Sequence, residues 1–199
     1  MSIRLYYNKF SRASRVRWML EELEAPYELV PVDMSKGEHK EDDYFDIHPL
    51  GKLPAIMDGD TPIFESSAIC LHLTDRFTNR KLAPELGSIE RGLYYQWAFY
   101  AQVTLEVPVY DYFRNHSKAD RNQEAADAVI AKFQELVRPI ENTLANGPYL
   151  LGDAFSTVDL LNGSILAWGA RMGMLEGRDT AKEYVDRIVS RPAFLRSLA

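Results

Sequence analysis

Short apolar runs and one amphipathic segment alternate along the first part of the chain. Residues 3–7 form a short apolar run, and residues 12–24 place four apolar side chains at helical spacing, namely Val16, Met19, Leu20 and Leu23. A second run rich in β-forming residues covers 27–32, after Pro26. This order predicts a strand, a helix and a second strand.

Two further apolar runs, 55–57 and 61–64, flank the dipeptide Asp58-Gly59. Asp-Gly between such runs is a strong hairpin signal. Pro62 places the second of these strands at an edge of the sheet, because proline cannot donate to the ladder. A helix over 66–77 is expected to follow. The first eighty residues therefore predict a small α/β domain.

The pattern changes at residues 79–87, where a proline and a glycine indicate a linker. Beyond it, apolar residues recur at helical spacing, which predicts helices over 89–112, over 122–145, from 156 onward and near 180–190. Pro108 is expected to kink the first of these helices because it lacks an N–H. Ser156, with Asp159 three residues later, resembles a capping box. The second part of the chain therefore predicts an all-helical domain.

Composition and charge limit the classes of partner that the protein is expected to bind. The chain has 199 residues, with 23 Lys+Arg against 29 Asp+Glu and a formal charge of −6. This acidic balance argues against nucleic-acid binding, which needs a basic face. No apolar run approaches the ~20 residues of a membrane span, and residues 1–20 carry four arginines rather than an apolar signal core. The single cysteine, Cys70, cannot form an internal disulfide, so a cytoplasmic protein is expected.

Candidate chemistry begins at the turn after the first strand. Ser11 lies there at the start of a helix, where free N–H groups and the positive end of the helix dipole stabilise an anion. Arginines occupy the first half of this helix and glutamates its last turn, which reverses the order that complements a helix dipole. Either an anion binds beside the turn, or Ser11 or Ser14 is a simple helix cap and the charges form a solvated face with an Arg17–Glu21 pair.

Two dipeptides and one histidine are further candidates for a binding site. Leu53-Pro54 precedes the hairpin, and Glu65-Ser66 begins the next helix. A carboxylate and a hydroxyl beside free N–H groups can hold the two charged ends of an amino-acid backbone, or can simply cap the helix. His39 lies in a polar loop. The four histidines show no spacing typical of metal ligands, so no metal site is expected.

These segments together resemble one family. The run 5–34, the segment GEHKEDDYFDIHPLGKLPAIMDGD and the segment FESSAICLHL resemble the N-terminal domain of cytosolic glutathione transferases, and YLLGDAFSTVDLL resembles their helical domain. The sequence departs from the family pattern at His48, where asparagine is common, and at Leu53, where valine is commoner. The resemblance implies a thioredoxin-like domain at 1–78, a linker at 79–87, an all-helical domain at 88–199, and a homodimer.

The resemblance also implies how glutathione binds. Leu53-Pro54 matches the position of a cis proline, where the backbone of Leu53 pairs with the cysteinyl part of glutathione. The Glu65-Ser66 pair matches the residues that hold the γ-glutamyl end. His39 falls where theta- and delta-like members place a histidine near the glycyl carboxylate, and Lys52 can share that role.

The residue that activates the thiol has several candidates. Ser11 aligns with the catalytic serine of theta- and delta-like members, and the string around it also resembles a related fungal and bacterial subgroup. Arg12 falls where the bacterial beta class carries a cysteine, so this chain lacks that group. Ser14 at the same turn and Tyr6 and Tyr7 near the end of the first strand are the rivals of Ser11.

The implied activity is that of a transferase acting in detoxification, which activates glutathione as a thiolate to attack a small hydrophobic electrophile. Glutathione is the co-substrate, and no cofactor, nucleic acid or membrane partner is expected. The candidate residues for the wall of the electrophile pocket are Trp97, Tyr100, Leu105, Tyr110 and Phe113. Their helical spacing is equally typical of a buried core. The alternative is a non-catalytic interaction protein of the same fold. A thiol–disulfide enzyme would need a cysteine after the first strand, whereas Cys70 lies on the third helix. Peroxidase, isomerase and dehalogenase activities remain open beside conjugation.

Overall fold

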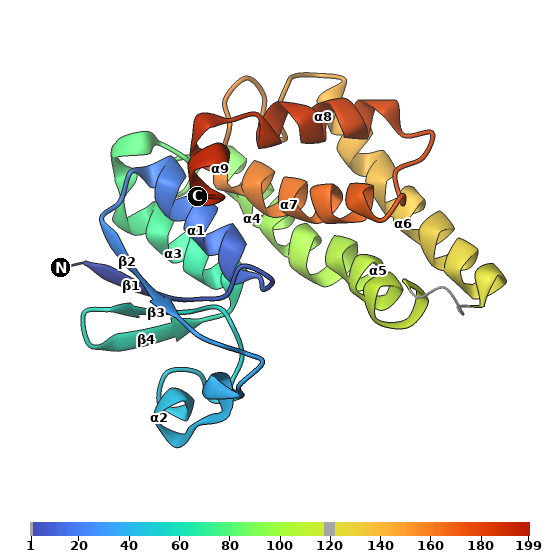
Figure 1. Ribbon diagram of the computed structural model, residues 1–199. Helices are drawn as coiled ribbons and strands as arrows, with labels where there is room; N and C mark the ends of the chain where they lie inside the picture. Colours follow the sequence, from blue (N-terminus) through green and yellow to red (C-terminus); the bar gives the residue numbers. More distant parts are fainter. Residues whose placement is uncertain (1, 118–121) are drawn as a thin grey trace. The chain divides into compact units, whose positions relative to one another are not determined.

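A computed structural model describes residues 2–117 and 122–199, whose contacts group into two units (Figure 1). The first unit runs to Lys81 and also contains Arg191–Ala199, and the second unit is Leu82–Ser190. The expected helical domain extended to residue 199, whereas the structure groups the last nine residues with the first unit. The packing of these residues against α1 explains the difference.

The sheet of the first unit has four strands in the order β2-β1-β3-β4. Its strands are β1 (Ile3–Tyr7), β2 (Tyr27–Pro31), β3 (Ala55–Asp58) and β4 (Thr61–Phe64). β1 pairs in parallel with β2, and the other two pairings are antiparallel. Asp58 pairs with Thr61 at the predicted hairpin, and Pro62 lies on β4, which is an edge strand. The strands predicted from the apolar runs are thus confirmed.

Two helices pack together on one side of this sheet, as Figure 1 shows. They are α1 (Ala13–Leu23) and α3 (Ser66–Arg76). The predicted stripe of α1 is fully or almost fully buried, and so are Ile69 and Leu73 of α3. The connection between β2 and β3 contains a 3₁₀ turn (Glu38–Lys40) and the short helix α2 (Asp42–Phe45). This packing fixes where α1 and α3 begin relative to the sheet.

The C-terminal helix α9 (Pro192–Ser197) packs against α1. Arg191 donates two hydrogen bonds to the carboxylate of Glu22, and Arg196 donates one to the carboxylate of Glu21 and one to its backbone carbonyl. The ring of Phe194 meets Trp18 edge-on, with 4.9 Å between the ring centroids. The glutamates at the negative end of α1 are therefore compensated by arginines from the end of the chain, which accounts for part of the reversed charge order in this helix.

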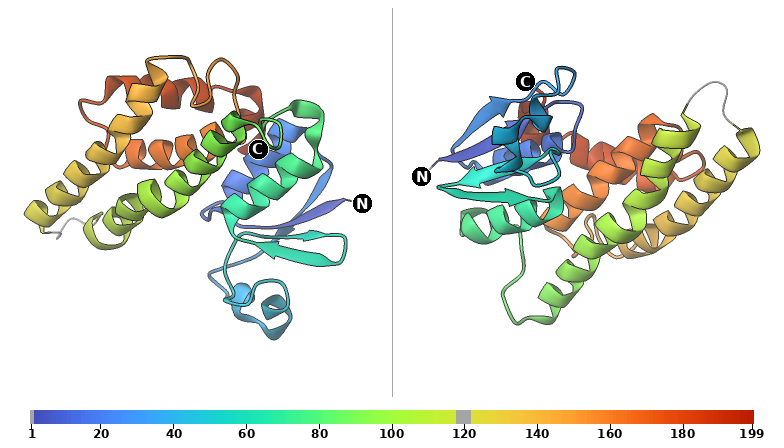
Figure 2. Two further views of the ribbon diagram at one scale, coloured as in Figure 1. Left: turned by 180° about the vertical axis from the view of Figure 1, so that it is seen from behind. Right: turned by 90° about the horizontal axis from the view of Figure 1, so that it is seen from below.

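The second unit is built from helices that follow the predicted ranges. They are α4 (Ile89–Phe99), a π-helical segment (Tyr100–Leu105), α5 (Glu106–Asp111), a second π-helical segment (Tyr112–His116), α6 (Gln123–Leu144), α7 (Thr157–Arg171) and α8 (Asp179–Val189). The first four form one helical path, and α6 packs along α5 (Figure 2). Pro108 denies a donor to the carbonyl four residues earlier, and the wide π turn directly before α5 accommodates that loss.

The predicted capping box of α7 is present and buried. One oxygen of Asp159 accepts from the backbone N–H and the hydroxyl of Ser156, at 2.9 Å and 2.7 Å. Its other oxygen accepts from the N–H of Leu150 and from the hydroxyl of Tyr184, both at 2.8 Å. This carboxylate therefore links α7, α8 and the loop before α7. Over the ranges 2–117 and 122–199, no helix is both long and apolar enough to span a membrane.

Candidate functional site

Strand pairing brings three of the predicted segments to one edge of the sheet. Tyr6 pairs with Ala55, and Ala55 pairs with Phe64. Because both pairings are antiparallel, the end of β1, the start of β3 and the end of β4 lie side by side. The turn that contains Ser11, the dipeptide Leu53-Pro54 and the dipeptide Glu65-Ser66 all adjoin these strand ends.

The turn between β1 and α1 is held by its own hydrogen bonds. Ser11 Oγ donates to the carbonyl of Asn8 at 2.8 Å and accepts from the N–H of Ala13 at 3.1 Å. The side-chain amide of Asn8 donates to the carbonyl of Val32 at 3.0 Å, which ties the turn to the end of β2. Ser14 lies inside α1, and its hydroxyl donates to the Ser11 carbonyl. Ser11, not Ser14, therefore receives a helical N–H.

The two rival tyrosines have different surroundings. The ring of Tyr6 contacts Tyr44 edge-on, with 5.6 Å between centroids. The ring of Tyr7 carries the guanidinium of Arg17 at 5.4 Å from its centroid. Both tyrosines are half-buried. Arg17 thus contacts the last residue of β1 and also donates a hydrogen bond to the hydroxyl of Tyr27.

The peptide bond between Leu53 and Pro54 is cis, as the resemblance implies. The residues before it form a tightly bonded turn. The hydroxyl of Tyr44 donates to the carbonyl of Lys52 at 2.8 Å, and Lys40 Nζ donates to the carbonyl of Leu50 at 2.9 Å. Gly51 has a φ of 53°, and a β-carbon there would collide with the carbonyl of His39. Glycine is therefore required where the His39 loop approaches this turn.

His39 and Lys52, the predicted partners of the glycyl carboxylate, lie on either side of that close approach. His39 is half-buried, and its Nδ1 has no hydrogen-bond partner among the residues that the structure describes. Lys52 is exposed. The contact between Gly51 and His39 brings the two segments together. A histidine and a lysine side chain thus lie at this end of the site.

Glu65 and Ser66 stand at the start of α3 in an arrangement that simple capping does not explain. Glu65 has a φ of 72°, a left-handed conformation that is costly for a residue other than glycine, and its side chain makes no capping hydrogen bond. Its carboxylate is on the surface, whereas Ser66 is buried. Ser66 Oγ accepts from Nη1 of Arg15 at 3.1 Å. Because Arg15 supplies that donor, the proton of the Ser66 hydroxyl points to another acceptor.

Arg15 is a residue of the site that sequence reasoning did not single out. It is one of the arginines in the first half of α1, and its side chain is buried, with 6% of its surface exposed. Buried arginines are rare unless they are paired. The only signal in the sequence was a positive charge inside an apolar helix stripe, beside Val16. Its partner Ser66 could not be inferred, because 51 residues separate the two.

Cys70 is excluded as a reactive thiol by its position. It lies on α3 and has no exposed surface. Burial raises the pKa of its thiol to about 12. Only the thiolate is an effective nucleophile, so this cysteine is inert in the folded protein. In the described parts of the chain, no group of three or more His, Cys, Asp or Glu side chains is placed to hold a metal ion.

The predicted wall residues of the electrophile pocket separate into two groups. Trp97 and Leu105 are buried in the helical core, and the hydroxyl of Tyr100 donates to the carbonyl of Leu136 on α6. Helical spacing could not distinguish these core positions from a pocket wall. Tyr110 and Phe113, by contrast, are 43% and 49% exposed.

The two exposed rings share a partner that the sequence did not reveal. Trp168 on α7 contacts Tyr110 at 6.5 Å and Phe113 at 5.4 Å between ring centroids. Three aromatic rings thus gather on the second unit. We call Tyr110, Phe113 and Trp168 the aromatic cluster.

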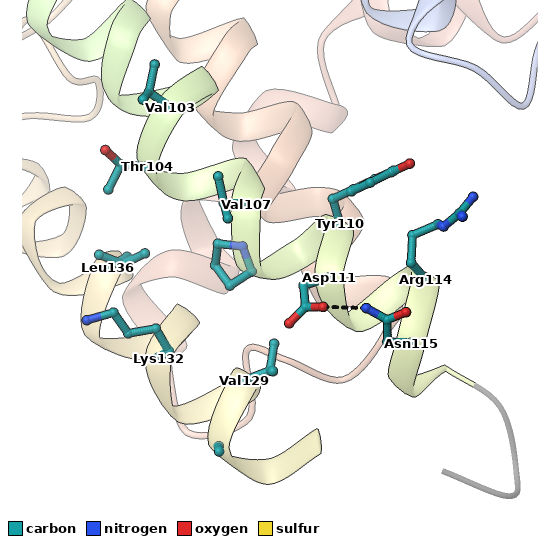
Figure 3. A pocket seen from close by; sticks show the side chains of 12 residues that line it. Val103, Thr104, Val107, Tyr110, Asp111, Arg114, Asn115, Val129, Lys132 and Leu136 are labelled. Atoms are coloured by element: carbon teal, nitrogen blue, oxygen red, sulfur yellow. Dashed lines mark hydrogen bonds between the residues drawn. The ribbon is translucent and has the colours of Figure 1, made fainter. Parts of the chain in front are cut away.

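A groove of about 940 Å³ lies in the second unit between α6 and the path formed by α5 and the two π-helical segments (Figure 3). Apolar side chains such as Val103, Val107 and Leu136 line it, together with the charged Asp111 and Lys132. Tyr110 also lines it, so this residue borders both the groove and the aromatic cluster. Trp97 and Leu105 do not belong to its lining.

A four-stranded sheet of mixed direction with helices packed on it, followed by a helical unit, defines a two-domain class of protein with a thioredoxin-like first domain. The family model of the glutathione S-transferase N-terminal domain matches residues 1–75, and that of the C-terminal domain matches residues 97–192. The chain belongs to the glutathione S-transferase family, whose substrate is glutathione.

Several relatives resemble the chain over nearly its whole length. Glutathione S-transferase 3 of Zea mays is 30% identical, over 93% of this chain and 87% of the relative. The Disulfide-bond oxidoreductase YfcG of Escherichia coli is 31% identical, over 96% of this chain and 92% of the relative. The crystal structure of poplar glutathione transferase F1 superposes with a TM-score of 0.86 at 27% identity, covering 100% of this chain and 97% of that one.

Proposed function

We propose that this enzyme binds glutathione at the sheet edge described above and activates its thiol as a thiolate. The thiolate then attacks a small hydrophobic electrophile, with no further cofactor. The observation that carries the proposal is the convergence of Ser11, Leu53-Pro54 and Glu65-Ser66 on the ends of β1, β3 and β4. These groups match the three chemical parts of glutathione, namely a thiol, a peptide and an amino-acid end.

The amino-acid end of glutathione carries an ammonium and a carboxylate. In our proposal the exposed carboxylate of Glu65 binds the ammonium, and the hydroxyl of Ser66 donates to the carboxylate. The hydrogen bond from Arg15 supports this second role, because it leaves the Ser66 proton available for an anion. The buried guanidinium also places a positive charge near that carboxylate.

The peptide and the far carboxylate occupy the opposite side of the site. We assign the cysteinyl backbone to Leu53, before the cis bond to Pro54. The glycyl carboxylate is assigned to His39 and Lys52. The Gly51 contact, which joins the loops that carry these two residues, supports the assignment.

Ser11 is proposed as the donor to the thiolate. A free thiol of this kind has a pKa near ~8.5, so a few percent is ionised at neutral pH, and a hydrogen bond to the thiolate raises that fraction. In the structure the Ser11 hydroxyl donates to the carbonyl of Asn8. Rotation of the hydroxyl hydrogen would redirect it to the sulfur, while Ser11 Oγ keeps the N–H of Ala13.

The electrophile is assigned to the second domain. The exposed faces of Tyr110 and Phe113, backed by Trp168, offer an apolar surface for an aromatic or aliphatic compound. The chemical class of the electrophile is therefore apolar and small.

Binding to immobilised glutathione followed by a panel of electrophiles tests the proposal. We expect retention on the resin, elution by free glutathione and turnover of at least one apolar electrophile. Ser11→Ala should bind but turn over slowly. A folded protein that does not bind glutathione refutes the proposal, and one that binds but is inert with every electrophile favours the non-catalytic alternative.

A second candidate activity is the glutathione-dependent reduction of disulfides. The similarity to a relative named as a disulfide-bond oxidoreductase favours it. The attacking sulfur would be that of glutathione, because Cys70 is buried and protonated. Turnover of a small disulfide such as hydroxyethyl disulfide, lost in Ser11→Ala but kept in Cys70→Ala, would support it.

We further propose that the enzyme works in the cytoplasm as a homodimer. Large apolar side chains are exposed along α4 and the π-helical segment after it, namely Ile89, Leu93, Phe99 and Val103. A second copy would bury such a surface. Light scattering at micromolar concentration should give about twice the 22.8 kDa of one chain, and a mass near 22.8 kDa would refute the dimer.

A further inference from the structure

His48 is a buried histidine in the turn that precedes Leu53-Pro54. It keeps only 3% of its surface exposed. Its ring atom Nδ1 accepts from the backbone N–H of Leu50 at 3.2 Å. Its backbone N–H donates to the carbonyl of Tyr44 at 2.9 Å, and its backbone carbonyl accepts from the N–H of Gly51 at 2.7 Å. The side chain therefore closes the same turn that its backbone begins.

The His48 ring also contacts β4. Its centroid lies 4.9 Å from that of Phe64, the last residue of the strand. Phe64 directly precedes Glu65, whose backbone is held in a strained left-handed conformation. One imidazole thus touches both the turn that leads to Leu53 and the strand end that leads to Glu65.

We propose that neutral His48 is a positioning residue of the glutathione site, which holds the Leu53 turn and the Glu65 strand end together and releases them when it is protonated. Glutathione affinity therefore falls on acidification. This inference rests on the function proposed above, because it assigns Leu53 and Glu65 to glutathione.

The hydrogen bond from Leu50 shows which protonation state of the imidazole holds the two segments together. An acceptor Nδ1 carries no proton, so the proton of the neutral ring is on Nε2. Protonation would place a second N–H against that of Leu50. The hydrogen bond would be lost, and a buried donor would be left unsatisfied.

Burial and three charged side chains determine the pH at which His48 is protonated. Burial lowers the pKa of His48, and the positive charges of Lys52 and Lys40 act in the same direction, whereas the negative charge of Glu65 opposes them. The net effect is a lowered pKa. The ring is therefore neutral at neutral pH, and it becomes charged only as the pH falls below the ordinary range of histidine.

Asparagine is the matched substitution for this test. A side-chain oxygen at this position can accept the N–H two residues on, as Asn does in Asx-turns, but it does not titrate. His48→Asn therefore keeps the hydrogen bond to Leu50 and removes the proton switch. His48→Ala removes both.

Calorimetric titration with glutathione from about pH 7.5 to about pH 5 separates these cases. Near pH 7.5, His48→Asn should bind like the parent protein, and His48→Ala about tenfold more weakly. As the pH falls, the parent should lose more affinity than His48→Asn, and the difference should be greatest at the acidic end of the range. Because the two proteins differ only at position 48, contributions from the other residues of the site cancel in the ratio of their affinities. His72→Asn, which alters a histidine paired with Asp58, is the control and should follow the parent.

A parent-to-Asn affinity ratio that stays constant over this range overturns the inference. Failure of the parent protein to bind glutathione at neutral pH would instead refute the proposed function, and with it the basis of the inference. A second measurement needs no variant. If protonation opposes binding, glutathione must lower the pKa of His48 in an NMR titration by the same coupling. An unchanged or raised His48 pKa in the complex also overturns the inference.

Discussion

Glu22 of α1 and Arg191 beside α9 are joined by two hydrogen bonds, of 2.7 Å and 2.8 Å, although 169 residues separate them in the sequence. The Glu22 carboxylate is almost fully buried, and it also accepts from Nε1 of Trp18 at 3.0 Å. A buried carboxylate that loses its cation keeps the cost of desolvation. Residues 191–199 therefore contribute to the stability of the first domain.

Replacement of Arg191 tests this relationship. We expect Arg191→Ala to lower the free energy of unfolding by about 2 kcal/mol, because Glu22 stays buried without its partner. Arg196→Ala, on α9 itself, is the matched control. Its pair with Glu21 is more exposed, so its loss should cost about 0.5 kcal/mol. Urea denaturation of both variants provides the measurement, and equal losses would contradict the distinction between the two pairs.

Ser11→Ala should reduce turnover about ten- to a hundredfold and leave glutathione affinity mostly intact. One hydroxyl donating to a thiolate contributes roughly 1.5–3 kcal/mol, and that stabilisation is lost from the ionised form. The thiolate absorbance of bound glutathione, followed against pH, should show a raised thiol pKa in this variant.

The matched variants for that titration are Ser14→Ala and Tyr7→Phe. Ser14 donates to the backbone inside α1, and the ring of Tyr7 carries Arg17, so neither change should move the thiol pKa. If one of them raises it while Ser11→Ala does not, the donor is that residue.

Arg15 and Ser66 should act on glutathione affinity as a coupled pair. Ser66→Ala and Arg15→Lys should each weaken binding about tenfold, because the first removes a donor to the carboxylate and the second misplaces the donor to Ser66. The double variant should lose little more than either single one. Arg17→Lys, two residues along the same helix, is the control. Fully additive losses in calorimetry would show that Arg15 acts independently of Ser66.

Substitutions in the aromatic cluster should affect the electrophile and not glutathione. Trp168→Leu withdraws the support of Tyr110 and Phe113, so the KM for an apolar electrophile should rise about fivefold or more, while the KM for glutathione stays constant. Tyr100→Phe removes only a hydrogen bond within the helical core and should lower stability instead. Steady-state kinetics with each substrate varied in turn tests both expectations.

Cys70 should resist thiol reagents in the folded protein. Its pKa, raised to about 12 by burial, leaves it protonated at about pH 8, where an ordinary cysteine of pKa ~8.5 is partly ionised. Ellman's reagent should therefore react with it only as fast as the first domain opens. In denaturant the reaction should be complete at once. Rapid labelling of the native protein would contradict its burial.

Local patterns were sufficient for most of the fold. The Asp58-Gly59 hairpin, the stripe of α1 and the Ser156–Asp159 capping box depend on residues near one another in sequence, and the structure confirms each. The placement of the last nine residues could not be predicted in this way. It depends on Arg191 meeting Glu22, which no periodicity encodes.

The candidate site could be predicted only in part, as far as it depends on local sequence patterns. The ends of β1, β3 and β4 follow from the strand order, and they bring the predicted dipeptides together. Contacts between side chains that are distant in sequence cannot be inferred from the strand order. Examples are the contacts of Arg15 with Ser66 and of His48 with Phe64. Burial is equally hidden, since Trp97 and Tyr110 share a helical path but differ in exposure.

The seating of α9 on α1 orders events during synthesis of the chain. Residues 191–199 leave the ribosome after the whole of the second domain, yet α1 needs them to cover Trp18 and to neutralise Glu22. Domains generally fold as units as they emerge, the N-terminal one first. Here the sheet of the first domain can pair early, but α1 reaches its final packing only after residues 191–199 have been synthesised. The first domain, although most of it is synthesised before the second, is thus completed only after the second domain has been made.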